Sequence, residues 1–289
     1  MNQGYGSQNM AGHLRRVLVK RPDSAFAVSD TARWHYTGRP NLEIALKEHG
    51  RFVELLHRVG TEVVYHEEPQ PKRADAIYVH DPAFVTDKGA ILLHMGKLLR
   101  RGEEEAIGRR FESLEIPIFY KLHGDATAEG GDLLWIDHDT LAVGQGFRTN
   151  GEGLRQLTLA MRALEVKVIP VPLPYFQGPD ACLHLMSFIS IIGEKIAVVY
   201  PSLMPIPFWQ ELRNRGFSFV EVADEEFLTM AANVLSLTPT SCVMLAGNPI
   251  TKKRLEEVGF EVLTYAGNEI SLKSEGGPTC LTRPILRTG

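Results

Sequence analysis

The sequence has few cysteines and no long hydrophobic run. Only three of its 289 residues are cysteine, at positions 182, 242 and 280, and no two of them form a CxxC pair. An odd and scattered set excludes a disulfide framework and favours a reducing compartment. No window approaches the roughly 18 apolar residues that a membrane helix needs. We therefore expect a cytoplasmic protein that has no membrane partner.

A strong charge of either sign is also missing. The chain has 31 Lys and Arg against 35 Asp and Glu, a net charge of −4. This balance argues against a nucleic-acid partner. Residues 1–12 are rich in Gly, Gln and Asn and lack an apolar segment, which predicts a flexible N-terminal arm over 1–14 and no signal peptide. No linker interrupts the remainder, so we expect residues 15–289 to form a single catalytic domain.

A fivefold internal repeat is present instead. Five times an amphipathic segment ends near a Gly or a Glu and runs directly into a β-rich stretch. These junctions, at 59–65, 114–120, 164–169, 215–220 and 258–263, recur roughly every fifty residues. Glycine commonly ends helices, which accounts for three of the five junctions. The pattern predicts five similar units, each with one helix followed by a strand.

Two short predicted strands precede four of these helices. The pairs occupy residues 77–93, 133–143, 183–199 and 234–245, each with a turn inside it. The first unit has only residues 16–20 before its helix, and residues 280–283 can supply the missing strand. A cyclic array closed by a terminal strand leaves no exposed sheet edge. We predict an α/β fold, a five-bladed pseudo-symmetric ββαβ propeller with a central cavity. The paired strands argue against the alternative, an open doubly wound sheet.

The segment 275–284 carries a candidate nucleophile. Gly276, Gly277 and Pro278 predict a tight turn, and Cys280 follows at once, before a short β-rich run. This pattern predicts a thiol at the mouth of a strand, with a backbone that a substrate can approach closely. A catalytic thiol needs an electropositive and partly open setting. By itself the pattern also fits a buried structural cysteine.

Several polar residues interrupt otherwise apolar segments, and the propeller would bring them to one central place. They are Asp75, His80 and Asp81, which we expect in a strand; Glu129 and Asp132 around a glycine pair; His184 in an apolar strand; and Arg100 and Arg148, each just before a helix. Taken one at a time, these residues also have structural explanations: the acids can belong to turns, the arginines to helix starts, and the histidines to the core. Together they suit a planar cation with an acidic tail, because carboxylates bind a guanidinium bidentately. The histidines lack zinc-ligand spacing, so we expect no metal.

On these residues the chain resembles the guanidino-group-modifying enzymes, in particular the dimethylarginine dimethylaminohydrolases and the related arginine deiminases. The resemblance extends over about residues 16–283. Its marks, in order, are Asp75 with Asp81, residues 100–103, Glu129-Gly130-Gly131-Asp132, residues 148–153, Leu183-His184-Leu185, and Gly276-Gly277 before Cys280. The resemblance implies the pentein fold, which is a five-bladed ββαβ propeller.

The resemblance also implies roles for individual residues. Cys280 would be the nucleophile, and His184 would be the general acid and base with Glu129 beside it. The cationic groups of the substrate would face Asp75 and Asp81, with His80 next to them, and Arg100 and Arg148 would hold its α-carboxylate. The implied reaction forms a covalent S-alkylthiouronium and hydrolyses it to citrulline or a related ureido product plus ammonia or an amine. It needs no cofactor.

Two departures leave the substrate open. His80 stands where hydrolases of methylated arginine usually carry Glu, and Met186 stands where arginine deiminases carry Asp. The sequence is also compatible with an amidinotransferase, which would pass the amidino group to an amine. A non-enzymatic alternative is a translation factor that shares the propeller, but Cys280, His184 and Glu129 argue against an inert centre. We expect a small guanidino compound as partner, and we leave a homodimer open.

Overall fold

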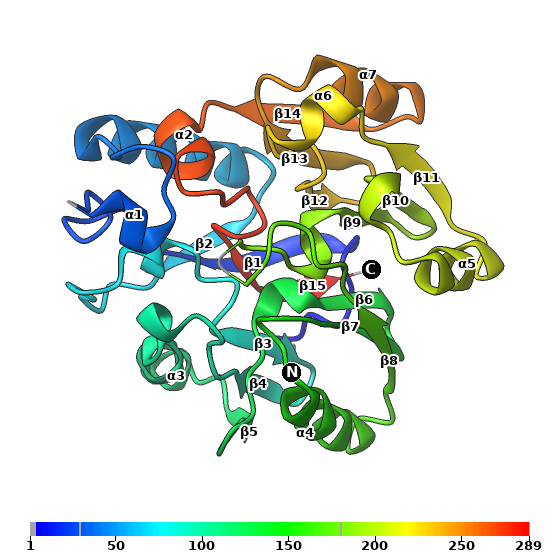
Figure 1. Cartoon of the computed structure of the whole chain (residues 1–289), viewed down its shortest axis with the longest axis horizontal. Helices are drawn as coiled ribbons and strands as arrows, with labels where there is room; N and C mark the ends of the chain where they lie inside the picture. The colour runs from blue at the N-terminus through cyan, green and yellow to red at the C-terminus, as the bar shows by residue number, and fades with distance from the viewer. Residues whose placement is uncertain (1–3, 29, 180, 289) are drawn as a thin grey trace.

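Five small sheets arranged around a centre make up the fold. The computed structural model describes residues 4–28, 30–179 and 181–288, and within them each sheet has three strands. In each sheet the central strand pairs antiparallel with one neighbour and parallel with the other. Figure 1 shows the sheets following one another around the molecule. The predicted five-bladed ββαβ propeller is confirmed.

The strands have the following bounds and order within the sheets. The first sheet is β15 (Arg283–Thr288), β1 (His13–Val19) and β2 (Glu62–Tyr65); the second is β3 (Ala83–Thr86), β4 (Gly89–Leu92) and β5 (Ile118–Lys121); the third is β6 (Leu133–Asp137), β7 (Thr140–Gln145) and β8 (Lys167–Pro172); the fourth is β9 (Ile189–Gly193), β10 (Ile196–Val199) and β11 (Ser218–Glu221); the fifth is β12 (Leu235–Thr238), β13 (Ser241–Leu245) and β14 (Glu261–Tyr265).

One helix in each unit connects the central strand to its parallel neighbour. These helices are α2 (Leu42–Arg58), α3 (Glu103–Ser113), α4 (Gly151–Arg162), α5 (Ile206–Asn214) and α7 (Pro249–Glu257). Two short helices, α1 (Thr31–Trp34) and α6 (Asp224–Phe227), lie outside this scheme. A parallel pair needs such a crossover connection. The five long helices lie toward the outside in Figure 1, so the strands are covered on that side.

The repeated Gly or Glu at the helix ends has a common geometry. Gly60, Gly216 and Gly259 adopt φ angles of 81°, 84° and 93°, and Glu115 and Glu165 adopt 60° and 58°. A residue in the left-handed region stops a helix and redirects the chain. This redirection leads directly into the parallel strand, which explains why the five junctions look alike in sequence.

The last strand joins the first sheet, as predicted, but it begins later than expected. β15 pairs antiparallel with β1, with Leu18 opposite Arg283 and His13 opposite Thr288. The predicted stretch was 280–283, whereas the strand runs from Arg283 and leaves Cys280 in the turn before it. The terminal strand thus completes the first sheet and holds the candidate nucleophile at its entrance.

The N-terminal segment lies against this same strand. The N–H of Gly6 donates to the carbonyl of Ile285 at 2.8 Å, and the N–H of Arg287 donates to the carbonyl of Gly6 at 2.9 Å. Residues 1–3 of the arm predicted over 1–14 lie outside the described residues. The division into an arm and one domain over 15–289 stays a prediction.

Candidate active site

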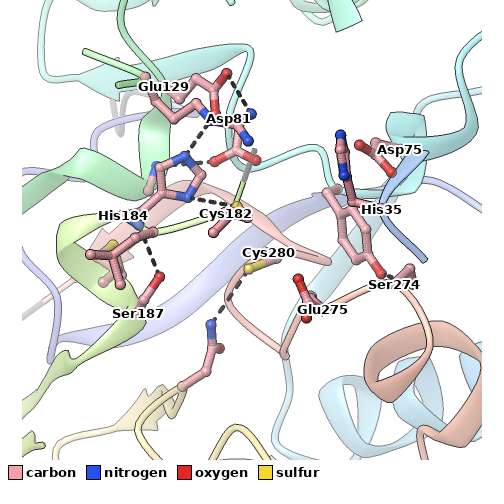
Figure 2. Close-up of a pocket in the computed structure, with 18 of the residues that line it drawn as sticks. His35, Asp75, Asp81, Glu129, Cys182, His184, Ser187, Ser274, Glu275 and Cys280 are labelled. Atoms are coloured by element: carbon pink, nitrogen blue, oxygen red, sulfur yellow. Dashed lines mark hydrogen bonds and ion pairs between the residues drawn. The ribbon is translucent and has the colours of Figure 1, made fainter. Parts of the chain in front are cut away.

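A cavity of about 410 Å³ lies at the centre of the propeller, where loops from different sheets meet. This volume is within the range of small-molecule sites. It is lined by all eight residues predicted for the site: Asp75, His80, Asp81, Arg100, Glu129, Arg148, His184 and Cys280. Figure 2 shows most of them converging from separate segments of the chain. The cyclic repeat therefore brings together the polar residues that interrupt apolar segments of the sequence.

Two local structures differ from the predictions. Asp75 lies in the short 3-10 helix η1 (Ala74–Ile77), and His80 and Asp81 lie in the turn before β3, so the predicted strand there is wrong. His184 likewise precedes the 3-10 helix η4 (Leu185–Ser187), and β9 begins only at Ile189. The apolar runs suggested strands, but these segments are buried loops at the inner ends of sheets.

Close packing explains the glycine pair before Cys280. A Cβ on Gly276 would collide with the ring of Tyr78, and one on Gly277 would collide with the side chain of Asn233. Asn233 accepts the N–H of Thr279 at 3.0 Å and donates its Nδ2 to the Sγ of Cys280 at 3.4 Å. The turn thus presents the thiol to the cavity in a fixed position.

The thiol of Cys280 has a high pKa in the free protein. Burial raises this pKa to about 12, and the nearby Asp81 adds to the effect because its negative charge disfavours a thiolate. A thiol is a poor nucleophile until it ionises. Ionisation at neutral pH therefore needs an additional positive charge in the cavity.

His184 forms a short ion pair with Glu129. Its Nε2 lies 2.7 Å from the Oε2 of Glu129, whose side chain is fully buried. The ring packs against Gly131, where a Cβ would collide with it. The other carboxylate oxygen of Glu129 accepts the N–H of Lys97 at 2.9 Å and lies 3.7 Å from Nη1 of Arg148. Because Gly131 has no side chain, the imidazole of His184 can pack close to the backbone there and lie beside Glu129.

The charges around this pair favour an imidazolium and a carboxylate. Burial alone would raise the pKa of Glu129, but hydrogen bonding to His184 and its charge lower it to about 2. Burial alone would lower the pKa of His184, but Cys182 and Asp81 raise it well above its ordinary value. His184 therefore carries a proton at neutral pH, as a general acid requires.

Asp132, the last residue of the same motif, holds the segment that follows His184. Its carboxylate accepts the hydroxyl of Thr149 at 2.6 Å and the N–H of Leu185 at 2.9 Å. The second of these bonds joins η3 (Gly130–Asp132) to the start of η4. Asp132 thus positions the backbone next to His184.

Cys182 lies beside His184, although no role was predicted for it from the sequence. Its Sγ is 3.7 Å from the Nδ1 of His184 (Figure 2). The two nitrogens of the imidazole therefore face Glu129 and Cys182. The only signal in the sequence was the spacing of two residues between Cys182 and His184.

Arg100 is paired inside the protein. Its Nη1 lies 2.6 Å from Asp81, its Nη2 lies 2.8 Å from Glu103, and the same Nη2 donates to the carbonyl of Tyr78 at 2.8 Å. The positive charges of Arg100 and His184 hold the pKa of Asp81 well below its ordinary value, although burial alone would raise it. Carboxylate binding by Arg100 stays a prediction, and its present contacts favour a role in positioning Asp81.

Asp75 is paired with a cation that the sequence did not suggest. Its carboxylate accepts the hydroxyl of Tyr36 at 2.8 Å and lies 2.6 Å from the Nζ of Lys97. The same Nζ lies 5.2 Å from the ring centre of Trp34 and donates to its carbonyl at 3.0 Å. Lys97 and Trp34 therefore belong to the cavity wall, although no motif in the sequence marks them.

His80 is buried and neutral. Its Nδ1 lies 2.8 Å from the carbonyl of Thr282, and its Nε2 has no partner among the described residues. Burial lowers its pKa to about 3, and the neighbouring Arg283 lowers it further. His80 cannot supply the negative charge that Glu would bring at this position.

Asp81, Glu129 and His184 are close enough to share an ion, with one ligand atom each within 4.8 Å of the others. Their atoms are engaged within the protein, however. Asp81 accepts the N–H of Gly131 at 3.0 Å besides its pair with Arg100, and Glu129 is paired with His184. We therefore interpret the group as an ion-pair network and assign no step to a metal.

Known proteins share this fold over almost the whole chain. A solved structure of dimethylarginine dimethylaminohydrolase from Pseudomonas aeruginosa, in complex with citrulline, has a TM-score of 0.79 at 22% identity, covering 94% of this chain and 99% of the other. A solved structure of SxtG, an amidinotransferase from Microseira wollei, has a TM-score of 0.82 at 16% identity, covering 99% of this chain and 98% of the other. At these identities the likeness establishes the fold.

Relatives found by sequence cover the chain to different extents. The uncharacterized protein YkgA of Bacillus subtilis is 29% identical over 96% of this chain and 93% of its own length. The dimethylarginine dimethylaminohydrolase of Pseudomonas aeruginosa is 24% identical over 93% of this chain and 98% of its own. An arginine deiminase of Borrelia recurrentis is 28% identical over 60% of this chain and 50% of its own.

Fold, site and relatives define a guanidino-group-modifying enzyme, a hydrolase of carbon–nitrogen bonds in linear amidines. A family model described as "N,N dimethylarginine dimethylhydrolase, eukaryotic" matches residues 27–287. The chain belongs to this family. In the part of the chain that the structure describes, no helix has both the length and the apolar character needed to span a bilayer.

Proposed function

We propose that the protein hydrolyses the guanidinium group of arginine or an N-substituted arginine through a covalent thiouronium on Cys280. One observation carries the proposal: Cys280 lines the same cavity as the His184–Glu129 ion pair and the buried Asp81. Relatives named dimethylarginine dimethylaminohydrolase and arginine deiminase support a guanidino substrate.

The first half-reaction uses the charge of the substrate. Because the pKa of Cys280 is about 12 in the free protein, a bound guanidinium supplies the positive charge that favours its thiolate, and the thiol proton leaves to solvent. The sulfur bonds to the central carbon of the guanidinium and forms a tetrahedral adduct. The carbon–nitrogen bond then breaks as His184 donates its proton to the leaving nitrogen, and ammonia or an amine departs.

The second half-reaction hydrolyses the adduct. The imidazole of His184, now neutral, accepts a proton from water as the water oxygen bonds to the thiouronium carbon. The carbon–sulfur bond then breaks and Cys280 leaves as thiolate. The new hydroxyl becomes the carbonyl of the ureido product as its proton passes to solvent, and the product is released. Glu129 orients the ring and stabilises its charged form throughout, because it is held 2.7 Å away and remains ionised.

Arg148 is the better placed of the two arginines to bind an α-carboxylate. Its guanidinium lines the cavity and, among the described residues, has only a long contact, 3.7 Å, to Glu129, whereas Arg100 is paired with Asp81 and Glu103. A planar guanidinium matches the geometry of a carboxylate. Asp81 faces the reacting group, with Arg100 as its positioning partner.

An amidinotransferase is the second candidate. It would form the same thiouronium and pass the amidino group to an amine in place of water, and the likeness in fold to SxtG favours this alternative. The curated relatives favour the hydrolase.

A screen of guanidino compounds tests both candidates. Arginine and its N-methylated derivatives are incubated with and without added amines, and ureido product, ammonia and released amine are measured, with Cys280→Ser as the control. The hydrolase predicts a ureido product that does not depend on added amine. Product that forms only with an added amine would favour the transferase, and no turnover of any compound would overturn the proposal.

A further inference from the structure

Arg100 is bound by two acids. Its Nη1 lies 2.6 Å from the Oδ2 of Asp81, and its Nη2 and Nε lie 2.8 Å and 3.1 Å from the Oε2 of Glu103. The three side chains are between 1% and 6% exposed. Asp81 and Arg100 line the cavity, whereas Glu103, the first residue of α3, does not. Glu103 therefore reaches a substrate through Arg100 and Asp81.

This buried group has an excess of negative charge when Glu103 is ionised. Two other buried acids of the cavity, Asp75 and Glu129, are each in an ion pair with a cation. Arg100 instead shares its positive charge between two carboxylates. Charges interact more strongly in a buried site than in water. Glu103 therefore offsets the charge of Arg100 and leaves Asp81 able to attract a cation.

The surroundings of Asp81 make this extra charge important. His80, next to it in the chain, is neutral. Arg283 is a buried cation whose charge interacts with that of Asp81, and because burial lowers its pKa only to about 9, it stays charged at neutral pH. If Asp81 were the only acid beside Arg100 and Arg283, these two arginines would repel the guanidinium of a substrate. Glu103 neutralises one of them.

We infer that Glu103 is a positioning residue of the reaction: it holds Arg100 against Asp81 and so keeps the Asp81 carboxylate oriented and negative toward the guanidinium of the substrate. The inference rests on the proposed function and adds to it a residue outside the cavity wall. On its other side Asp81 is fixed by the N–H of Gly131, which donates to its Oδ1 at 3.0 Å. Binding of a cationic head group should depend on Glu103, and binding of a neutral one should not.

The charge of Glu103 should change with pH in the neutral range. Burial raises its pKa to about 7; Arg100 opposes this shift, and the negative charges of Asp75 and Asp81 add to it. Lys20 also lies close enough for its charge to interact with Glu103. As the pH rises through about 7, Glu103 loses its proton and the site gains a negative charge. The affinity for a cation should therefore rise over the same range.

Two ligands that differ in the head group separate charge from structure. The cationic ligand is arginine, or the N-methylated arginine that the screen of guanidino compounds shows to be the better substrate. The neutral ligand is citrulline, the ureido product of either, which has the same remote end. Dissociation constants are measured by isothermal titration calorimetry at about pH 6 and about pH 8, on either side of the pKa of Glu103. The parent protein carries Cys280→Ser, so that no turnover occurs.

Glu103→Gln and the matched control Glu105→Gln are each added to this parent. Glu105 is an exposed acid in the same first turn of α3. At about pH 8, Glu103→Gln should weaken binding of the cation about tenfold and of citrulline less than about twofold. At about pH 6 the cation should bind the variant and the parent within about threefold of each other, because Glu103 is then largely protonated. Glu105→Gln should change neither ligand more than about twofold.

Two further measurements support the comparison. In an Arg100→Gln background, adding Glu103→Gln should change binding of the cation less than about twofold, because the effect passes through Arg100. The parent protein, with Glu103 intact, should bind the cation about fivefold more tightly at about pH 8 than at about pH 6, and citrulline within about twofold. This last measurement tests the inference even if Glu103→Gln fails to fold.

The outcomes separate the inference from the function. An equal loss for the cation and for citrulline, a loss that is the same at both pH values, or a parent whose affinity for the cation does not rise with pH would overturn the role of Glu103 while the hydrolase stands. No turnover of any guanidino compound by the wild-type protein would overturn the proposed function, and the inference with it.

Discussion

The two thiols that line the cavity have different surroundings. Cys182 is exposed, and its Sγ lies 3.7 Å from the imidazole of His184. Cys280 is partly exposed, is held in a glycine turn, and has the amide of Asn233 as its hydrogen-bond donor. Proximity to an imidazole would favour Cys182 as nucleophile, whereas the fixed turn favours Cys280.

The difference shows how the thiol can be activated. In the proposed reaction, the imidazole protonates the leaving group and so must not be consumed in deprotonating the nucleophile. A thiol whose pKa burial raises to about 12 stays protonated until a cation arrives. Under our proposal the guanidinium of the substrate is that cation, so Cys280 becomes nucleophilic only when the site is occupied.

The largest expected effect separates the two thiols directly. Cys280→Ser should lower kcat by at least about 10⁴-fold, because removing a nucleophile abolishes the covalent route. Cys182→Ser should retain turnover within about tenfold, because the hydrogen bond of Cys182 is to the acid–base residue. The measurement is the rate of ureido product formation, and Cys242→Ser serves as a buried control. A loss as large in Cys182→Ser as in Cys280→Ser would contradict the assignment.

Removing the imidazole should reveal the covalent intermediate. His184→Gly should lower kcat by about 10²- to 10⁴-fold, the usual contribution of general acid–base catalysis. The second step should slow at least as much as the first, because water is a weaker nucleophile than thiolate. Intact-mass spectrometry after acid quench should then detect an added mass on Cys280. Near-normal turnover would return His184 to a structural role.

A smaller effect is expected when only the charge beside the imidazole is removed. Glu129→Gln should lower the pKa of His184, so the imidazolium is lost as the pH rises through a lower value than in the wild-type protein. We expect kcat to fall about 10²-fold at pH 8 and to recover partly at pH 6, where the proton returns. Glu152→Gln, in the first turn of α4, is the control. An unchanged pH profile would be inconsistent with this role.

The smallest expected effect concerns labelling of the free protein. The pKa of Cys280, about 12, implies that its reaction with neutral iodoacetamide rises about tenfold per pH unit from pH 7 upward. A cationic haloacetamidine should label Cys280 at least about tenfold faster at pH 7, because its charge favours the thiolate. Peptide mapping in a Cys182→Ser background identifies the labelled residue. Equal rates for the two reagents would argue against activation by substrate charge.

Much of this architecture was readable from the sequence because it depends on local features. Residues such as Gly60 and Glu165 end a helix by adopting a left-handed backbone, and that property recurs at each of the five junctions. The strand that closes the first sheet could be predicted because the first unit has one strand too few before its helix. The turn before Cys280 follows from its two glycines. Five similar units in a ring bring the polar residues that interrupt their apolar segments to one centre. All eight predicted site residues therefore line the cavity.

Only the tertiary structure decided how the charges pair. Arg100 lies against Asp81, and Lys97 lies against Asp75, because loops from separate segments converge at the inner ends of the sheets. Apolar runs such as those beside Asp75 and His184 suggest strands in sequence, yet burial at that centre holds them as loops and 3-10 turns. Pairing at a distance depends on where side chains meet in space, which periodicity along the chain does not specify.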